Sequence, residues 1–280
     1  MGDSCSSRET RDWARELKFL IDERQAPAVR EWARARLAPD HFGSGPHGDH
    51  YTTTSLYFET PAFDVYHRRG SYGRSKFRIR RYGESDIVFL ERKFRTNRLL
   101  AKRRTTVPMA EMEHLAGPMP VPSWPGYWFH RRVLLRRLNP LIQMSYDRTA
   151  RVGMASAGTM RMTIDTNLRV LPMPDRAFIP GVGFPLIEGQ CIVELKYRVE
   201  LPALFRQLVE TFKLAPSPVS KYRIGLGALD YAPLTAARED ALRELATEGL
   251  GGVGIPLDAV AQAAPAVGVP HHAIEEHPPS

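Results

Sequence analysis

The chain has 280 residues, of which 43% are hydrophobic, enough for a buried core in one large domain or two small ones. It contains no run of about 18 apolar residues, which excludes a predicted membrane-spanning helix. The polar residues 1–12 do not form an apolar signal segment, and neither Cys5 nor Cys191 lies in a disulfide or zinc-binding pattern. We therefore expect a cytoplasmic protein.

The formal net charge is +8, and it is unevenly distributed. Residues 233–280 carry a net charge of −5, so the preceding residues carry +13. A body this basic predicts an anionic partner: nucleic acid, a membrane surface or phosphorylated small molecules. The basic residues are not interleaved with aromatic ones, and no basic recognition helix stands out, so we do not expect nucleic acid.

In chain order, strands are predicted at residues 13–22, 52–59, 75–82, 87–95, 100–107, 141–151, 160–170 and 191–199. Helices are predicted at 28–37, 127–138 and 201–212. Most strands are joined by hairpins, which indicates an α+β fold: an eight-stranded antiparallel β-barrel, or tunnel, with flanking helices. We expect residues 1–12 to be a disordered N-terminus, 13–232 to be the single domain, and 233–280 to be a mostly disordered tail.

Several predicted strands alternate charged and apolar residues. Because successive side chains point to opposite faces, Glu194 and Lys196 share one face, as do Lys76, Arg78 and Arg80. A third such set is Glu91, Lys93 and Arg95, and a fourth is Arg161, Thr163, Asp165, Asn167 and Arg169. One charged face is usually solvated. Several of them around a barrel favour a wet, cationic interior.

An inward ring of cations repels itself unless an anion binds, and phosphate oxygens suit Arg and Lys. Taken singly, each Glu is most simply an ion-pair partner. Beside a phosphate chain, however, carboxylates can also hold Mg²⁺ or Mn²⁺, which take oxygen ligands.

The sequence resembles the triphosphate tunnel metalloenzymes, the CYTH-like superfamily, and within it the polyphosphate polymerase domain of the vacuolar transporter chaperone (VTC) family. The matching segments are 16–19, 56–61, 74–82, 89–93, 101–104, 145–149, 161–165, 192–197 and 220–222. The resemblance implies a metal-dependent ATP–polyphosphate phosphotransferase. Its partners would be ATP and inorganic polyphosphate, with Mn²⁺ or Mg²⁺ as cofactor; a membrane or regulatory partner is left open.

The resemblance also implies roles for individual residues. The expected catalytic residues that contact phosphate are Lys18, Arg78, Arg80, Lys93, Lys102, Arg104, Arg148, Lys196 and Lys221. Additional substrate-binding candidates are Arg74, Lys76, Arg103, Arg161 and Ser220. The expected metal ligands are Glu194, with Glu91 and Glu16 as weaker candidates. Strand phase favours Lys102 and Arg104 over Arg103, and Ser220 precedes a segment that it could instead cap as a helix.

Ala14 stands where the hydrolytic branch of the superfamily has a first Glu, which favours the polymerase branch. Two rival functions remain: a hydrolase of inorganic or nucleoside triphosphates on the same tunnel, and a polyphosphate-binding module without turnover.

Overall fold

The computed structural model describes residues 14–72, 75–96, 99–173 and 176–230. The chain divides into a unit of residues 1–249 and one of residues 250–280, and all described residues belong to the first. The expected N-terminal and C-terminal disorder and the substrate-binding candidate Arg74 lie outside the described residues. No helix in the described ranges is both long and apolar enough to cross a membrane.

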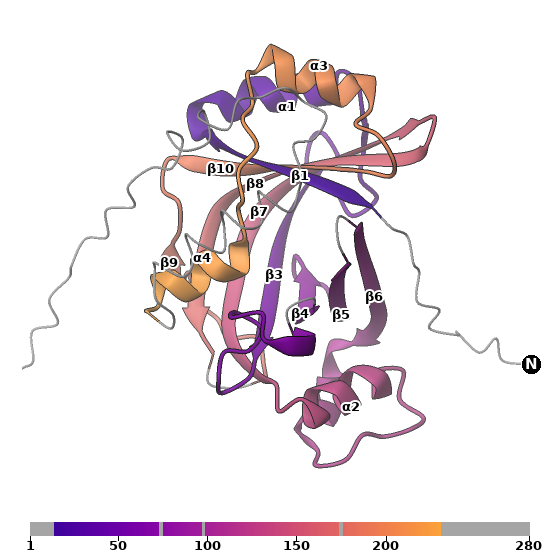
Figure 1. Cartoon of the computed structure of the whole chain (residues 1–280), viewed down its shortest axis with the longest axis vertical. Coiled ribbons are helices and arrows are strands. Elements are labelled where there is room, and N and C mark those ends of the chain that lie inside the picture. The colour runs from indigo at the N-terminus through magenta and orange to yellow at the C-terminus, as the bar shows by residue number, and fades with distance from the viewer. Residues whose placement is uncertain (1–13, 73–74, 97–98, 174–175, 231–280) are drawn as a thin grey trace, which may run out of the picture. The chain divides into compact units, whose positions relative to one another are not determined.

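One antiparallel sheet organises the fold, and eight of its strands follow the order β1-β10-β8-β7-β3-β4-β5-β6 (Figure 1). These strands are β1 (Arg15–Asp22), β3 (His50–Glu59), β4 (Ser75–Tyr82), β5 (Ile87–Thr96), β6 (Leu99–Pro108), β7 (Asn139–Ala155), β8 (Gly158–Pro172) and β10 (Gln190–Tyr197). The short strands β2 (Ala38–Pro39) and β9 (Phe184–Pro185) pair with β7 and β8. The predicted antiparallel, tunnel-like architecture is confirmed, with one difference: β1 and β6 are not paired, so hydrogen bonds do not close the sheet.

Helices α1 (Ala26–Arg34) and α3 (Ala203–Thr211) cover the outer face of β1, β8 and β10 (Figure 1). Trp32 of α1 and Phe205 of α3 pack there against alternate strand residues such as Met162 and Val193. Pro27 lies in the first turn of α1, where its missing N–H costs nothing. These apolar contacts turn the opposite, charged faces of the same strands toward the interior.

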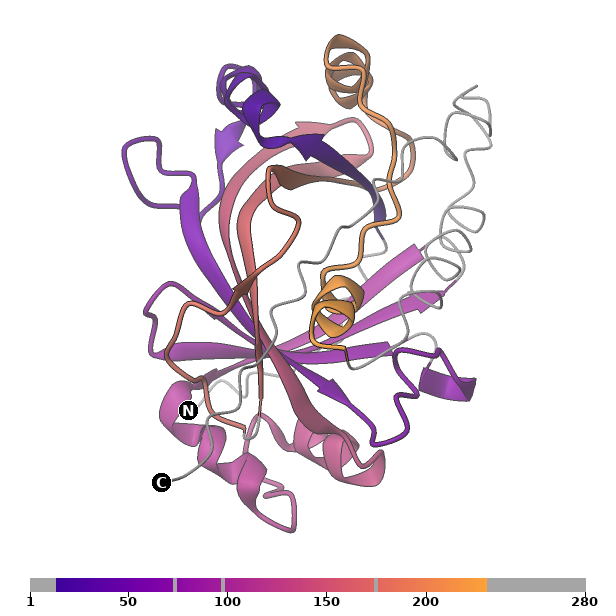
Figure 2. The ribbon, with the colours of Figure 1, turned by 90° about the vertical axis from the view of Figure 1, so that its left-hand side faces the viewer.

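The outer face of β4, β5 and β6 is covered in the same way. Helix α2 (Tyr127–Leu135) and the 3₁₀ helix η3 (Met109–Ala116) contribute Phe129 and Leu115 to a core that includes Phe77 and Leu90. Two shorter 3₁₀ helices, η1 (Glu23–Gln25) and η2 (Gly70–Tyr72), lie in connections. Apolar side chains therefore face outward to the helices on both walls of the curved sheet (Figure 2).

Helix α4 (Lys221–Ala228) follows Ser220, where the sequence allowed a helix, and packs on the inner face of β7 and β8. A Cβ at Gly225 would lie 2.7 Å from Met144 Cε, so only glycine permits this approach without a shift. The adjacent Tyr222 donates its hydroxyl to Glu59, whose carboxylate also accepts the backbone N–H groups of Val65 and Tyr66. These contacts hold the first residue of α4 at the interior.

The pairing of β7 with β8 shifts between Ser145 and Asp147, where β8 carries one extra residue. At this bulge, Asn167 adopts a left-handed conformation with φ of 51°, which Asn tolerates better than most residues. Asn167 then points outward and donates to Asp147 at 2.8 Å, whereas Leu168 becomes buried. The predicted shared face of residues 161–169 is therefore wrong after Asp165.

Candidate functional site

The inner faces of β4, β5 and β6 carry side chains in register, and the first row is entirely cationic. Lys93 on β5 lies opposite Lys76 on β4 and Lys102 on β6. Lys76 donates to Ser220 Oγ at 3.1 Å, and Lys93 crosses the interior to donate to Glu16 on β1 at 2.9 Å. Three adjacent like charges destabilise a sheet unless an anion offsets them. In this lysine row (Lys76, Lys93, Lys102), Glu16 offsets the charge of Lys93, and Glu91 lies 3.3 Å from Lys102.

The second row places Arg78, Glu91 and Arg104 side by side. Glu91 is fully buried, and the Nε atoms of Arg78 and Arg104 each donate to it at 2.6 Å; Lys102 Nζ lies 3.3 Å away. Burial alone would raise the pKa of Glu91, but Arg78, Lys102 and Arg104 hold it well below its usual value. Burial in turn lowers the pKa of Lys102 to about 8. Glu91 thus acts as the counter-ion of this wall.

The third row begins with Arg80, whose side chain is 4% exposed. Its Nε donates to Ser55 Oγ at 3.1 Å and its Nη2 to Tyr146 Oη at 3.0 Å. It forms no ion pair with any residue that the structure describes. Because a buried charge without a counter-ion is unfavourable, Arg80 marks a place where an anion would be stabilising.

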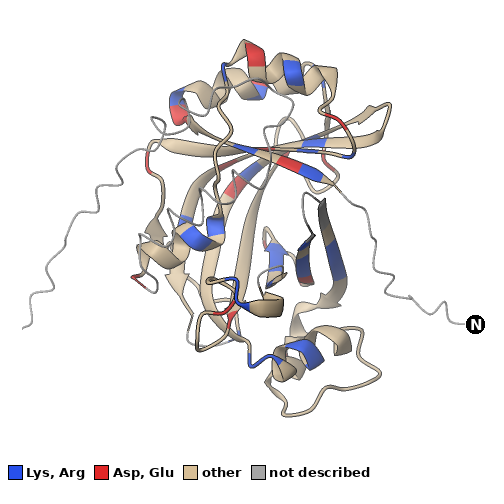
Figure 3. Ribbon diagram, in the orientation of Figure 1, with Lys and Arg blue, Asp and Glu red and all other residues tan. Residues whose placement is uncertain are grey.

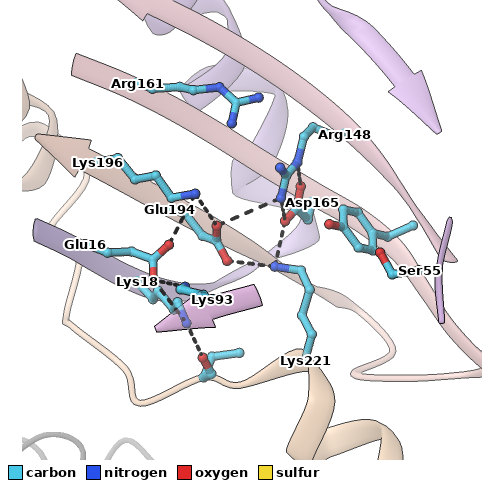
Figure 4. Close-up of polar contacts among 12 residues, drawn as sticks. Glu16, Lys18, Ser55, Lys93, Arg148, Arg161, Asp165, Glu194, Lys196 and Lys221 are labelled. Carbon is cyan, nitrogen blue, oxygen red and sulfur yellow. Dashed lines mark hydrogen bonds and ion pairs between the residues drawn. The ribbon is translucent and has the colours of Figure 1, made fainter. Parts of the chain in front are cut away.

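The opposite wall, formed by β1, β8 and β10, mixes cations with carboxylates (Figures 3 and 4). Arg148 holds Asp165 through two bonds of 2.6 and 2.7 Å. Lys221, the first residue of α4, lies 2.6 Å from Asp165 and 2.9 Å from Glu194. Although burial opposes ionisation, Arg148 and Lys221 lower the pKa of Asp165, and Lys221 with Lys196 lowers that of Glu194. Both carboxyls are therefore ionised at neutral pH.

Glu16 lies between three lysines: Lys93 at 2.9 Å, Lys196 at 3.4 Å and Lys18 at 3.6 Å. Burial raises the pKa of Glu16, but Lys93 and Lys18 outweigh it and keep the carboxyl ionised. Burial lowers the pKa of Lys196 to about 7, despite its attraction to Glu16 and Glu194. Lys196 therefore changes charge near neutral pH.

The remaining predicted residues divide between the interior and the exterior. Arg161 lies beside the interior, where it donates to Asp40 at 2.8 Å and to Tyr51 Oη at 2.7 Å. Ser220 accepts from Lys76 and makes no helix-capping bond, contrary to the alternative interpretation. Among the predicted substrate contacts that the structure describes, Arg103 lies on the outer face: its guanidinium stacks 4.3 Å from the Trp128 ring, because strand alternation turns it away from Lys102 and Arg104.

Sequence reasoning did not select Asp165, although it shares strand phase with Arg161 and is the bidentate partner of Arg148. It also overlooked hydroxyl groups that position the arginines. Tyr57 accepts from Arg78 at 3.2 Å, and Tyr146 accepts from Arg80. The alternation of side chains along β3 and β7 could have identified these inward positions, but they were missed because the prediction was based on charged residues and Tyr is uncharged.

Two of the three predicted metal ligands lie close to the same ammonium group on the β1–β10 wall. Glu16 and Glu194 are both ionised and both approach Lys196, at 3.4 and 4.0 Å. Two carboxylates with phosphate oxygens suit Mg²⁺ or Mn²⁺. Glu91, on the other wall, is bound by Arg78 and Arg104, so the three glutamates do not meet. No cluster of three His, Cys, Asp or Glu side chains among the described residues could hold a metal alone.

Comparison with curated protein sequences finds no match. Among solved structures, a putative adenylate cyclase from Bacillus halodurans has 17% identity and a TM-score of 0.47, covering 73% of this chain and 92% of its own. A putative adenylyl cyclase from Hippeastrum, described as having a dominant triphosphatase activity, has 13% identity and a TM-score of 0.46, covering 77% of this chain and 95% of its own. The family model described as "VTC domain" matches residues 14–229. The chain therefore belongs to the VTC domain family.

Proposed function

We propose that the protein is a polyphosphate polymerase that transfers the γ-phosphate of ATP to a growing inorganic polyphosphate chain inside the cationic interior. The observation that carries this proposal is Arg80, a buried guanidinium with hydroxyl partners and no ion pair among the described residues. Its neighbours support the same ligand, because the lysine row presents three adjacent ammonium groups from neighbouring strands.

The two walls would hold a triphosphate between them. Lys93 contacts one carboxylate and Lys196 and Lys221 contact two each, all through their ammonium groups, and phosphate oxygens can replace such contacts. Arg78 and Arg148 keep their positions through Glu91 and Asp165. The positive charges of the interior would then be fully balanced only when the anion is bound.

In the proposed reaction, a terminal oxygen of the polyphosphate chain attacks the γ-phosphorus of ATP. The bond between this phosphorus and the β,γ-bridging oxygen breaks, its electron pair stays on that oxygen, and ADP leaves. The attacking phosphate oxygen is already ionised at neutral pH, so no side chain has to remove a proton. The protein has to position the groups and neutralise their charge.

We assign these tasks to the side chains that face the interior. The proposed phosphate contacts are Lys18, Arg78, Arg80, Lys93, Lys102, Arg104, Arg148, Lys196 and Lys221. Lys76, Arg161 and Ser220 would contribute further substrate contacts, with Arg74 as an additional candidate. Glu194, with Glu16, would hold Mn²⁺ or Mg²⁺, which supplies positive charge to the phosphate oxygens when bound.

The test is to incubate the purified protein with ATP and Mn²⁺ and to separate the products by length on a gel. Long chains with ADP support the proposal. Orthophosphate or pyrophosphate without chains indicates a hydrolase on the same site. Tight, salt-sensitive polyphosphate binding without turnover indicates a binding module. Arg80→Met should abolish chain formation, whereas the outward-facing Arg103→Met should not.

A further inference from the structure

Four aromatic side chains gather at and beyond the third row, at the end of the interior opposite the lysine row, and one of them, Phe89, is paired with Arg80. Tyr51, Tyr82 and Phe89 come from the inner faces of β3, β4 and β5, and Phe42 comes from the loop before β3. The ring centroid of Phe42 lies 4.6 Å from that of Tyr82 and 5.8 Å from that of Phe89. Phe42, Tyr82 and Phe89 are half-buried, so this aromatic cluster keeps accessible ring surface.

The aromatic cluster is continuous with the proposed phosphate contacts. Arg104 lies 4.2 Å from the centroid of Phe89 and donates to Tyr82 Oη at 2.9 Å. Arg80 lies 5.9 Å from the Tyr82 ring. A phosphate bound by Arg80 and Arg104 would therefore place whatever it is attached to against these rings.

The loop that carries Phe42 is itself fixed to the interior. Asp40 Oδ1 accepts the backbone N–H of Phe42 at 3.1 Å, and its other oxygen accepts from Arg161 at 2.8 Å. Arg161 also donates to Tyr51 Oη at 2.7 Å. Phe42 is thus held in place by a buried carboxylate and is not a freely moving loop side chain.

We propose that the aromatic cluster (Phe42, Tyr51, Tyr82, Phe89) is a nucleoside subsite that stacks the base of a nucleoside triphosphate. This inference rests on the proposed function and adds a direction to it: the base lies at the aromatic end, and the phosphates extend toward the lysine row. Stacking of a base on aromatic rings contributes about 1–3 kcal/mol per base and does not depend on base identity.

The subsite offers ring faces and few groups to read a base. The hydroxyl of Tyr82 is engaged by Arg104, and that of Tyr51 by Arg161. ATP and GTP should therefore bind with similar affinity. Inorganic tripolyphosphate has no base, so its affinity should not depend on the aromatic cluster.

The experiment measures the affinities of ATP, GTP and tripolyphosphate by calorimetry for the full chain and its variants. Phe42→Ala, and Phe42→Leu as a milder replacement that keeps apolar volume, should weaken ATP and GTP binding about tenfold, corresponding to about 1.4 kcal/mol. Tripolyphosphate affinity should change by less than about twofold. Phe184→Ala, which removes an exposed ring from β9, is the matched control and should change neither.

Unchanged nucleotide affinity in both folded Phe42 variants overturns the nucleoside subsite, even if the protein makes polyphosphate from ATP. Equal weakening of ATP and tripolyphosphate also overturns it, because the defect would then lie in phosphate binding. Conversely, base-dependent ATP binding in a protein that makes no chains supports the subsite and refutes the polymerase proposal.

Discussion

Glu16 on β1 and Lys93 on β5 form a 2.9 Å ion pair across the interior, although their strands lie near opposite ends of the strand order. The sheet edges β1 and β6 do not pair within the described residues, and this side-chain contact is one link between the two walls there. Glu16 also approaches Lys196, which links the contact to the β10 side of the site. A phosphate that binds Lys93 would therefore compete with the Glu16 ion pair and weaken this link between the two walls.

Replacing Arg80 should weaken anion binding without lowering the stability of the fold. Arg80→Met should weaken tripolyphosphate binding by about tenfold to about a hundredfold, since bonds to charged groups contribute about 1.5–3 kcal/mol. The free energy of unfolding should stay the same or rise, because no buried carboxylate loses a partner. Calorimetry and urea denaturation measure the two effects. Arg103→Met is the control for charge, and normal anion affinity in Arg80→Met would remove the basis of the proposed function.

Replacing Arg148, in contrast, should lower the free energy of unfolding. Arg148→Met leaves the fully buried Asp165 with Lys221 as its remaining ion-pair partner among the described residues, so we expect about 3–5 kcal/mol of destabilisation in urea denaturation. Adding Asp165→Asn should recover part of this loss by removing the stranded charge. A double variant that is less stable than Arg148→Met would contradict the assignment of this pair.

Anion binding should depend on pH through Lys196. With a pKa of about 7 in the free protein, Lys196 loses its charge as the pH rises through 7, so tripolyphosphate affinity should fall over that range. Lys196→Arg keeps the charge and should flatten this part of the profile relative to the wild type. Calorimetry from pH 6 to about 8.5 compares the two proteins. Identical profiles would show that another group titrates.

Acid should destabilise the fold through its buried carboxylates. The folded pKa values of Glu91, Asp165 and Glu194 lie below those of the unfolded chain, so the unfolded state binds more protons as the pH falls below about 5. Their contribution to stability is present above that pH and is lost as the folded groups protonate. Lys196 acts at higher pH, where its lowered pKa makes stability rise between about 7 and 10.5. Chemical denaturation as a function of pH measures both, and Glu91→Gln should reduce the acid-dependent loss.

Replacing Glu194 and replacing Glu91, which lie on opposite walls, should affect Mn²⁺ binding differently. In the presence of tripolyphosphate, Glu194→Gln should weaken Mn²⁺ binding about tenfold, or about 1.4 kcal/mol, in calorimetry. Glu91→Gln should leave Mn²⁺ affinity unchanged and instead lower the free energy of unfolding, because a neutral amide cannot offset Arg78 and Arg104. Loss of Mn²⁺ binding in a folded Glu91→Gln protein would overturn this division.

Strand alternation is a local property, and the sequence by itself determined which residues share a face. It predicted the inward phase of Arg78 and Arg80, and it favoured Lys102 over Arg103, as the structure shows. The antiparallel architecture also followed from the strand and hairpin pattern. It could not predict the phase change at Asn167, because the extra residue of β8 is defined only by its pairing with β7.

Which charged groups meet is decided by tertiary structure, because pairing depends on register and on the curvature of the sheet. Glu16, Glu91 and Glu194 look alike in the sequence, yet Glu91 lies between two arginines on one wall, and the other two approach Lys196. Lys221 reaches Glu194 only because α4 packs inside the sheet. The sequence thus determined which charged residues line the cationic interior. Long-range packing decided which of them form ion pairs with one another, and it left Arg80 without an ion pair among the described residues.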